Sequence, residues 1–233
     1  ATTEAIFALL SGGQELLVPS QPVELMVGTE TFNTNGNSDQ PETAYFKKVW
    51  NTNEIKPEMA KVTIDNPNDN IAWGGLHWQY FEDLDQVTSA VGPLSIKKQL
   101  YKVVRSASGE KLESVREGTD LALGDLIRVR LEITSDREME YIHLKDMRAS
   151  GLEPINVLSE YKWQDGLGYY ESTRDAATNF FIERLPKGTF VFEYDLRVNN
   201  KGEFSNGITS IQNMYAPEFS SHSEGMRIKV GEK

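Results

Sequence analysis

The chain has 233 residues, with 24 Lys and Arg against 35 Asp and Glu, a formal net charge of -11 and no cysteine. Hydrophobic residues make up 39% and aromatic residues 10% of the chain, which excludes a disordered tail. Its apolar runs are only a few residues long, so no insertion into a membrane is expected. The length allows one large domain or two small ones, and we expect two.

The acidic charge and the absence of cysteine exclude several partners and cofactors. Clustered Lys and Arg hold nucleic acid, and here acidic residues are spread along the whole chain, so no nucleic-acid partner is expected. Without cysteine the chain has no disulfide, no thiol nucleophile and no Cys-ligated zinc or iron–sulfur cluster. No cofactor is expected.

The first 13 residues predict a short helix. Ile6, Leu9 and Leu10 share one side at helical spacing, and a Ser-Gly-Gly sequence ends the pattern at residue 13. Such a short helix is only marginally stable in water unless it packs on something. We interpret residues 1–13 as the last helix of a helical domain that lies outside this chain. A short helix lying on a β-sandwich is the alternative.

From residue 18 onward the apolar residues recur with a period of two, which is typical of half-buried strands. The alternation predicts strands at residues 23–27, 62–64 and 76–80, separated by a polar loop and an Asn-rich turn. Residues 82–92 are acidic and have no clear period. We therefore expect one β region over residues 18–92 and a domain boundary at its end.

The second half shows the same alternation more strongly. Strands are expected at residues 94–104, 127–133, 139–145, 180–185, 190–198, 208–212 and 226–230. About seven short strands at this spacing are typical of a β-sandwich, which we place at residues 93–233. The predicted fold class is mainly β: two antiparallel β-sandwich regions preceded by one short helix.

No motif of a common enzyme class occurs in the sequence, whether a phosphate-binding loop, a dinucleotide fingerprint or a nucleophile elbow. The three histidines, His77, His143 and His222, lie far apart in the sequence. We interpret them as surface or rim histidines rather than as metal ligands. The expectation is a chain with no catalytic and no metal-binding residues.

Two acidic groups leave alternatives open. The first group consists of Glu82, Asp83 and Asp85. These carboxylates could bind a hard cation, but we interpret them as a solvated linker. A glycosidase carboxylate pair could come from the second, which consists of Asp165, Glu171 and Asp175, although such a pair needs a cleft that the sequence cannot show. We prefer neither the cation site nor the glycosidase pair.

Two segments hold apolar side chains outside any clear period. Residues 161–170 combine three Tyr, one Trp and two Gly, which predicts a loop whose Trp163, Tyr169 and Tyr170 contact a sugar or a partner surface. The alternative is that these aromatic rings fold back and fill the end of the sandwich. In the second segment Met214 and Tyr215 stay apolar in a turn, where Pro217 ends the preceding strand.

The second half of the chain resembles the last domain of bacterial alpha-2-macroglobulins, of the type found in Bacteroidetes. The similarity is carried by residues 123–133 and 146–156, and it continues through short blocks whose order and spacing agree with the family: Arg174-Asp175, Phe180-Phe181, Leu185-Pro186-Lys187-Gly188, Phe192-Glu193-Tyr194 and Met214-Tyr215-Ala216-Pro217-Glu218. Together these blocks cover most of residues 94–230.

The resemblance implies an organisation for the whole chain. In that family a helical thioester domain is inserted in a β-sandwich of the CUB type. Residues 1–13 would be the closing helix of the thioester domain, residues 18–92 the returning CUB-like strands, and residues 93–233 the macroglobulin-like, immunoglobulin-like β-sandwich. The match over residues 18–92 rests on position in the chain and not on motifs.

The resemblance also implies a function. The family comprises broad-spectrum endopeptidase inhibitors that trap a protease after it cuts a bait region, and some members capture it through a Cys–Gln thioester. Without cysteine this chain cannot contain the thioester. It would be a non-catalytic part whose partners are the thioester and macroglobulin domains of the same full-length chain and, through them, target proteases.

The resemblance assigns roles to particular residues. In thioester-bearing members a Met-Tyr pair in the last domain covers the thioester, and Met214 and Tyr215 match that pair, next to Pro217. The resemblance further implies a periplasmic or cell-surface location as part of a lipoprotein, although residues 1–10 show no signal-peptide pattern. The alternative function is a carbohydrate-binding or adhesin-like sandwich that uses Trp163, Tyr169 and Tyr170 as a stacking platform.

Overall fold

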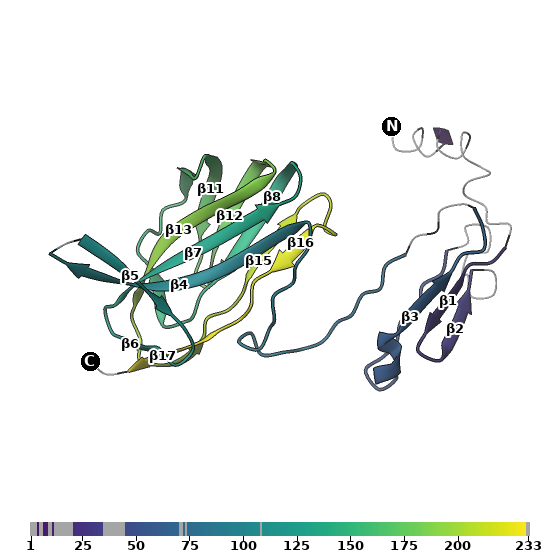
Figure 1. Ribbon diagram of the computed structural model, residues 1–233, viewed down its shortest axis with the longest axis horizontal. Helices are drawn as coiled ribbons and strands as arrows, with labels where there is room; N and C mark the ends of the chain where they lie inside the picture. Colours follow the sequence, from purple (N-terminus) through teal and green to yellow (C-terminus); the bar gives the residue numbers. More distant parts are fainter. Residues whose placement is uncertain are drawn as a thin grey trace. The chain divides into compact units, whose positions relative to one another are not determined.

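The computed structural model describes residues 4, 7, 8, 11, 21–34, 45–69, 72, 74–107 and 109–231. It divides into two compact units, Ala1–Gln79 and Tyr80–Lys233 (Figure 1). Within residues 1–13, the four described residues are helical. The rest of the predicted helix lies outside the described residues, so its role as the last helix of another domain stays a prediction.

The first unit holds one small antiparallel sheet in the order β2-β1-β3. Its elements are β1 (Glu24–Val27), β2 (Glu30–Asn33), the 3-10 helix η2 (Pro57–Ala60) and β3 (Val62–Asp65). Its buried cluster consists of Val27 from β1, Phe32 from β2 and Met59 from η2. The strands expected at residues 23–27 and 62–64 are confirmed.

The strand expected at residues 76–80 is wrong. Residues 76–80 pair with no strand in the described part of the chain. The side chains of Leu76, Trp78 and Tyr80 are all more than half exposed. Alternation of apolar and polar residues favours a strand only where a neighbouring strand completes the hydrogen-bond ladder. The CUB-like assignment of residues 18–92 stays a prediction.

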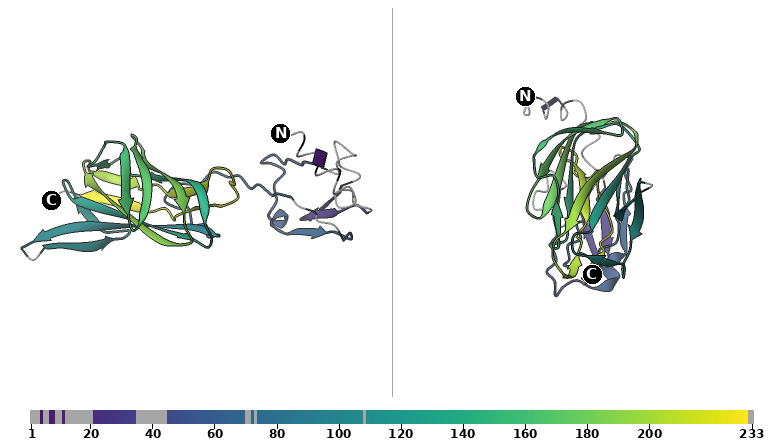
Figure 2. Two further views of the ribbon diagram at one scale, coloured as in Figure 1. Left: turned by 90° about the horizontal axis from the view of Figure 1, so that it is seen from above. Right: turned by 90° about the vertical axis from the view of Figure 1, so that its left-hand side faces the viewer.

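The second unit is a sandwich of two antiparallel sheets (Figures 1 and 2). A five-stranded sheet has the order β5-β4-β7-β13-β9, with β4 (Leu94–Ser106), β5 (Gly109–Val115), β7 (Leu126–Ser135), β9 (Leu152–Pro154) and β13 (Gly188–Val198). A six-stranded sheet has the order β10-β11-β12-β8-β15-β16, with β8 (Met139–Met147), β10 (Glu160–Gln164), β11 (Leu167–Thr173), β12 (Ala177–Leu185), β15 (Thr209–Asn213) and β16 (Ser220–His222).

One hydrophobic core fills the space between the two sheets. Strand β7 shows how the sequence builds it: Ile127, Val129, Leu131 and Ile133 are fully buried, whereas the residues between them are partly exposed. A third small sheet closes one end of this core in the order β14-β17-β6, with β6 (Asp120–Ala122), β14 (Gly202–Ser205) and β17 (Arg227–Gly231). The predicted mainly β fold is confirmed, and its named strands pair antiparallel except for β17 with β6, which run parallel.

The segment before β4 belongs to the second unit and packs on its C-terminal part. The Ala90 amide donates to the His222 carbonyl at 3.0 Å, and the Gly225 amide donates to the Val87 carbonyl at 2.8 Å. The Asp85 carboxylate pairs with Arg227 at 3.0 Å and is only 8% exposed. The interpretation of this acidic group as a solvated linker is therefore wrong for Asp85.

Candidate functional site

The loop between β15 and β16 is held by a dense set of backbone hydrogen bonds. The Asn213 side-chain oxygen accepts hydrogen bonds from the amides of Tyr215 and Ala216, both at 3.0 Å. The Asn213 amide donates to the Phe219 carbonyl at 3.0 Å, and the Phe219 amide donates back to Ala216 at 2.9 Å. A Met214 amide bond to the Tyr141 carbonyl, also 3.0 Å, ties the loop to β8. The loop is thus a braced turn.

This braced loop presents apolar side chains to solvent. Met214 is 57% and Tyr215 is 78% exposed, and Pro217 is exposed as well. The Tyr215 ring meets the Tyr141 ring edge to face, with 5.2 Å between centroids. Tyr141 has a φ of 57°, in the left-handed region that residues with a Cβ rarely adopt. The exposed Met-Tyr pair therefore lies in a turn after β15, as the sequence predicted.

Further aromatic side chains cross the outer face of the same sheet. Tyr161, Tyr170, Phe181 and His143 are successive cross-strand partners on β10, β11, β12 and β8, so they share one face. The ring centroids of Tyr161 and Tyr170 are 5.0 Å apart, and those of His143 and Phe181 are 4.9 Å apart. We call these four residues the aromatic row. Sequence reasoning missed it, because register between distant strands cannot be read from spacing.

The aromatic segment at residues 161–170 is a β-hairpin, so the predicted loop is wrong. Strands β10 and β11 meet at Asp165 and Gly166, whose φ values of 51° and 75° match a two-residue hairpin turn. The Asp165 carboxylate accepts the Val191 amide at 2.9 Å, which fixes the hairpin to β13. An Asp-Gly pair between apolar runs was the signal available in the sequence.

The hairpin divides its three candidate contact residues between its two faces, with Trp163 and Tyr170 on the outer face and Tyr169 on the inner one. Trp163 is 77% exposed, and its ring lies over Gly168, where a Cβ would come within 2.9 Å of it. Tyr170 is half-buried within the aromatic row, while Tyr169 is 2% exposed and stacks on Phe192 with centroids 4.3 Å apart. Tyr169 therefore fills the core, and the three residues do not form one stacking platform.

The candidate residues His143, Asp165 and Glu171 each have a partner of their own and do not meet in one site. Among the described residues no group of three or more His, Asp or Glu could hold a metal ion. His143 shares a hydrogen bond of 3.0 Å between its Nε2 and the Asn179 side-chain oxygen. Glu171 pairs with Lys162 inside the sandwich, away from Asp165 at the hairpin turn. Across the described part of the chain, no helix is long and apolar enough to cross a membrane.

Comparisons with known proteins agree with this sandwich. Residues 94–218 match the family model of the bacterial alpha-2-macroglobulin MG10 domain. The alpha-2-macroglobulin homolog of Nostoc sp. is 28% identical over 158 residues, which cover 64% of this chain and 8% of that protein. The circularly permutated Ras protein 2 of Dictyostelium discoideum is 19% identical over 110 residues, or 47% of this chain and 3% of that protein.

The solved structures that resemble this chain also include bacterial alpha-2-macroglobulins. A crystal structure of a mutant Salmonella alpha-2-macroglobulin, in which one tyrosine is replaced by glycine, has a TM-score of 0.49 and 18% identity. The similarity covers 62% of this chain and 10% of that one. The chain thus spans only a small part of the length of these relatives.

Proposed function

Because the chain belongs to the bacterial alpha-2-macroglobulin family through its MG10 domain, we propose that it is a non-catalytic docking part of a protease inhibitor. Its task is to hold the thioester domain of the same full-length chain in the resting state. The protease trap, with bait cleavage and rearrangement of domains, belongs to the full-length protein. That protein acts in the periplasm or at the cell surface.

The exposed Met214–Tyr215 pair is the observation that carries this proposal. An apolar ring and a flexible thioether that stand in solvent on a braced loop suit a covering role, because they exclude water without bringing charge. Their loop is fixed at both ends, so a docked partner meets a preorganised surface and little ordering cost is added. In thioester-bearing family members such a pair shields the thioester from water.

The aromatic row extends the apolar surface along the same sheet. Tyr161 is 81% exposed and Phe181 40%, and both lie on the outer face rather than in the core. Exposed apolar surface of this kind commonly marks an interface. A neighbouring domain of the parent chain is the partner that this surface would receive.

The proposal is tested in the full-length protein with Tyr215→Gly, and with Tyr215→Phe as the matched control. Hydrolysis of a thioester adds water and frees one thiol, which a thiol reagent counts over time. Tyr215→Gly removes the ring, so we expect thiol release to accelerate about tenfold or more, which corresponds to about 1.4 kcal/mol of barrier. Tyr215→Phe keeps the ring and should behave like the unchanged protein.

A second measurement reports docking independently of the chemistry. X-ray scattering of the full-length Tyr215→Gly variant should show a more open resting shape, because the domain contact is weakened. Equal thiol release together with an unchanged scattering profile would refute the docking role of this loop.

A further inference from the structure

The Met214–Tyr215 loop rests on a residue with an unusual backbone conformation. Among the described residues, only two with a side chain have a positive φ, Tyr141 at 57° and Asp165 at 51°. Asp165 lies in the two-residue turn of the β10–β11 hairpin, where Asp adopts this conformation readily. Tyr141 lies within strand β8, and a Tyr rarely adopts it there. Strain of this kind persists only where the surrounding contacts hold it.

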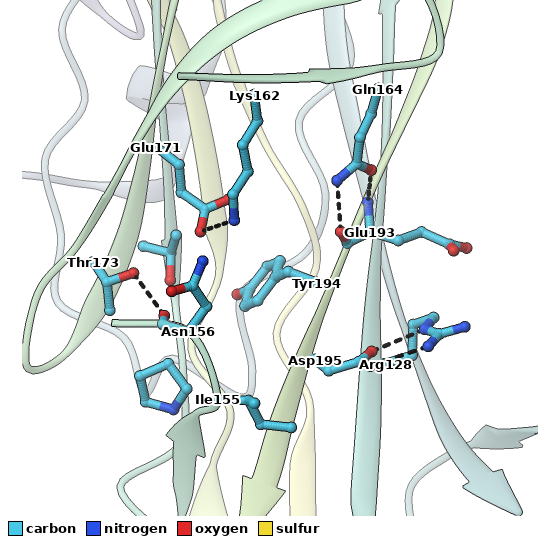
Figure 3. A pocket seen from close by; sticks show the side chains of 12 residues that line it. Arg128, Ile155, Asn156, Lys162, Gln164, Glu171, Thr173, Glu193, Tyr194 and Asp195 are labelled. Atoms are coloured by element: carbon cyan, nitrogen blue, oxygen red, sulfur yellow. Dashed lines mark hydrogen bonds and ion pairs between the residues drawn. The ribbon is translucent and has the colours of Figure 1, made fainter. Parts of the chain in front are cut away.

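The end of the sandwich near the β10–β11 hairpin is complete in itself. A pocket of about 400 Å³ opens there, and its charged side chains pair with one another, as Figure 3 shows. The Lys162 ammonium lies 2.9 Å from the Glu171 carboxylate, and the Arg128 guanidinium lies 2.8 Å from the Asp195 carboxylate. Turn geometry and paired charges thus account for this end of the sheet, whereas neither accounts for Tyr141.

Tyr141 contacts the Met214–Tyr215 loop in two ways. Its carbonyl accepts the Met214 amide at 3.0 Å, a bond that any residue could make because it uses only the backbone. Its ring meets the Tyr215 ring at an interplanar angle of 84°, with 5.2 Å between centroids, and this contact needs an aromatic side chain. Tyr141 is 46% exposed, so its ring does not fill the core.

The ring contact matters because the Tyr215 side chain is otherwise free to turn. Hydrogen bonds to Asn213 fix the backbone of residues 215 and 216 but leave χ1 of Tyr215 open. Tyr215 is 78% exposed, and in the described part of the chain no ring other than that of Tyr141 contacts it. An unrestrained side chain divides its time among three staggered χ1 positions. The Tyr141 ring favours one of them.

A residue that served only the backbone at position 141 would be less strained. Asn and Gly adopt the left-handed region more easily than Tyr, and both would keep the carbonyl that accepts the Met214 amide. Tyr141 therefore gives up stability in exchange for a ring on the surface. An exchange of this kind is typical of functional sites.

We propose that Tyr141 is a positioning residue for Tyr215, whose side chain it holds ready for the docked domain. This role rests on the docking function proposed above. Without the Tyr141 ring, Tyr215 spreads over three χ1 positions, so the docking-competent fraction falls about threefold and docking weakens by the same factor.

The first test measures the couplings between Hα and Hβ of Tyr215, which report χ1, by NMR of the 233-residue chain. We expect one dominant rotamer in the unchanged chain. Tyr141→Asn removes the ring and tolerates the left-handed backbone, so its couplings should be averaged. Tyr141→Phe brings the ring back and should restore the single rotamer. Averaged couplings in the unchanged chain, or a single rotamer in Tyr141→Asn, overturn the proposal.

Urea unfolding separates positioning from a purely structural role. Tyr141→Asn relieves backbone strain, so we expect its urea midpoint to be no lower than that of the unchanged chain, even though Tyr215 loses its single rotamer. Val157→Asn introduces the same residue at a position before β10 that is 64% exposed, and it should leave the couplings of Tyr215 unchanged. A lower midpoint for Tyr141→Asn, or its failure to fold, would make Tyr141 a structural residue and overturn the proposal.

The second test measures thiol release in the full-length protein. We expect Tyr141→Asn to accelerate release about threefold, and Tyr141→Phe to return it to the unchanged rate. Acceleration by Tyr215→Gly but not by Tyr141→Asn overturns the positioning role and leaves the docking role intact. If Tyr215→Gly does not accelerate release either, the docking role fails, and the couplings alone decide whether Tyr141 positions Tyr215.

Discussion

The Lys98 ammonium lies 2.6 Å from the Asp146 carboxylate, and the two side chains are 5% and 0% exposed. Lys98 belongs to β4 in the five-stranded sheet and Asp146 to β8 in the six-stranded sheet, so the ion pair joins the two sheets through the core. Asp146 also accepts hydrogen bonds from the hydroxyls of Tyr194 and Thr209, the latter at 2.6 Å. Lys98 donates further to the Met147 carbonyl at 2.6 Å.

Replacing Asp146 with Ala should strongly destabilise the second unit. The change leaves the Lys98 ammonium buried without its counter-charge, and removing one partner of a buried pair costs about 3–5 kcal/mol. Urea unfolding followed by circular dichroism measures the free energy of unfolding. Glu132→Ala, which breaks the exposed pair between Lys97 and Glu132, is the control and should cost less than about 1 kcal/mol. Similar costs for both variants would contradict the structural role of the buried pair.

The sandwich was predictable wherever alternation alone decides the structure. In β7 and β13 every second residue is apolar, and the ladder between them runs from Gly188 opposite Ser135 to Arg197 opposite Leu126. In β4 the same alternation puts Lys98 on the apolar side of the strand, between Ile96 and Leu100. Its partner could not be predicted, because only the packing of two sheets brings β4 and β8 together.

The candidate site was predictable only in part, for a similar reason. A turn after β15 with Pro217 was enough to expect Met214 and Tyr215 outside the sheet. The difference between Trp163 and Tyr169 depends on hairpin register, which sends one ring to solvent and the other into the core. Composition indicated aromatic contacts but not which ring makes them.

The stability of the second unit should fall in alkaline solution. Burial raises the pKa of Tyr194 well above its ordinary value, and the nearby Asp146 carboxylate raises it further. Burial, followed by the charge of Glu171, also raises the pKa of Tyr169. Below about pH 10 these hydroxyls are neutral in both the folded and the unfolded chain. Above it the unfolded chain ionises first, so the free energy of unfolding decreases as pH rises.

The tyrosine effect is isolated with single variants. Tyr194→Phe loses a hydrogen bond at neutral pH, but its free energy of unfolding should decline less steeply between about pH 9 and about pH 11 than that of the unchanged chain. Tyr161→Phe alters a hydroxyl on a ring that is 81% exposed and serves as the control. Urea midpoints across this pH range measure the slopes, and parallel slopes for Tyr194→Phe and the unchanged chain would rule out this cause.

Gly225→Ala should detach the segment before β4. A Cβ at Gly225 would lie 1.8 Å from the Leu84 carbonyl oxygen, which belongs to backbone and cannot rotate away. Forcing such an overlap typically costs about 1–3 kcal/mol. We expect faster proteolytic cleavage within residues 82–90, where the Gly225 amide normally holds Val87. Gly231→Ala, where a Cβ meets nothing within 4 Å, should leave the cleavage rate unchanged.

Asn213 should control the order of the loop that carries Met214 and Tyr215. Asn213→Ala removes the oxygen that accepts the Tyr215 and Ala216 amides, and leaving such donors unpaired costs about 1–3 kcal/mol. Asn213→Asp keeps an acceptor oxygen at the same place and is the matched control. Amide hydrogen exchange at residues 215 and 216 should accelerate in Asn213→Ala while exchange in β7 stays slow, because only the loop loses its bracing. Unchanged exchange at both amides would show that the loop is ordered without the Asn213 side chain, and the preorganisation argument for docking would then rest on the wrong residue.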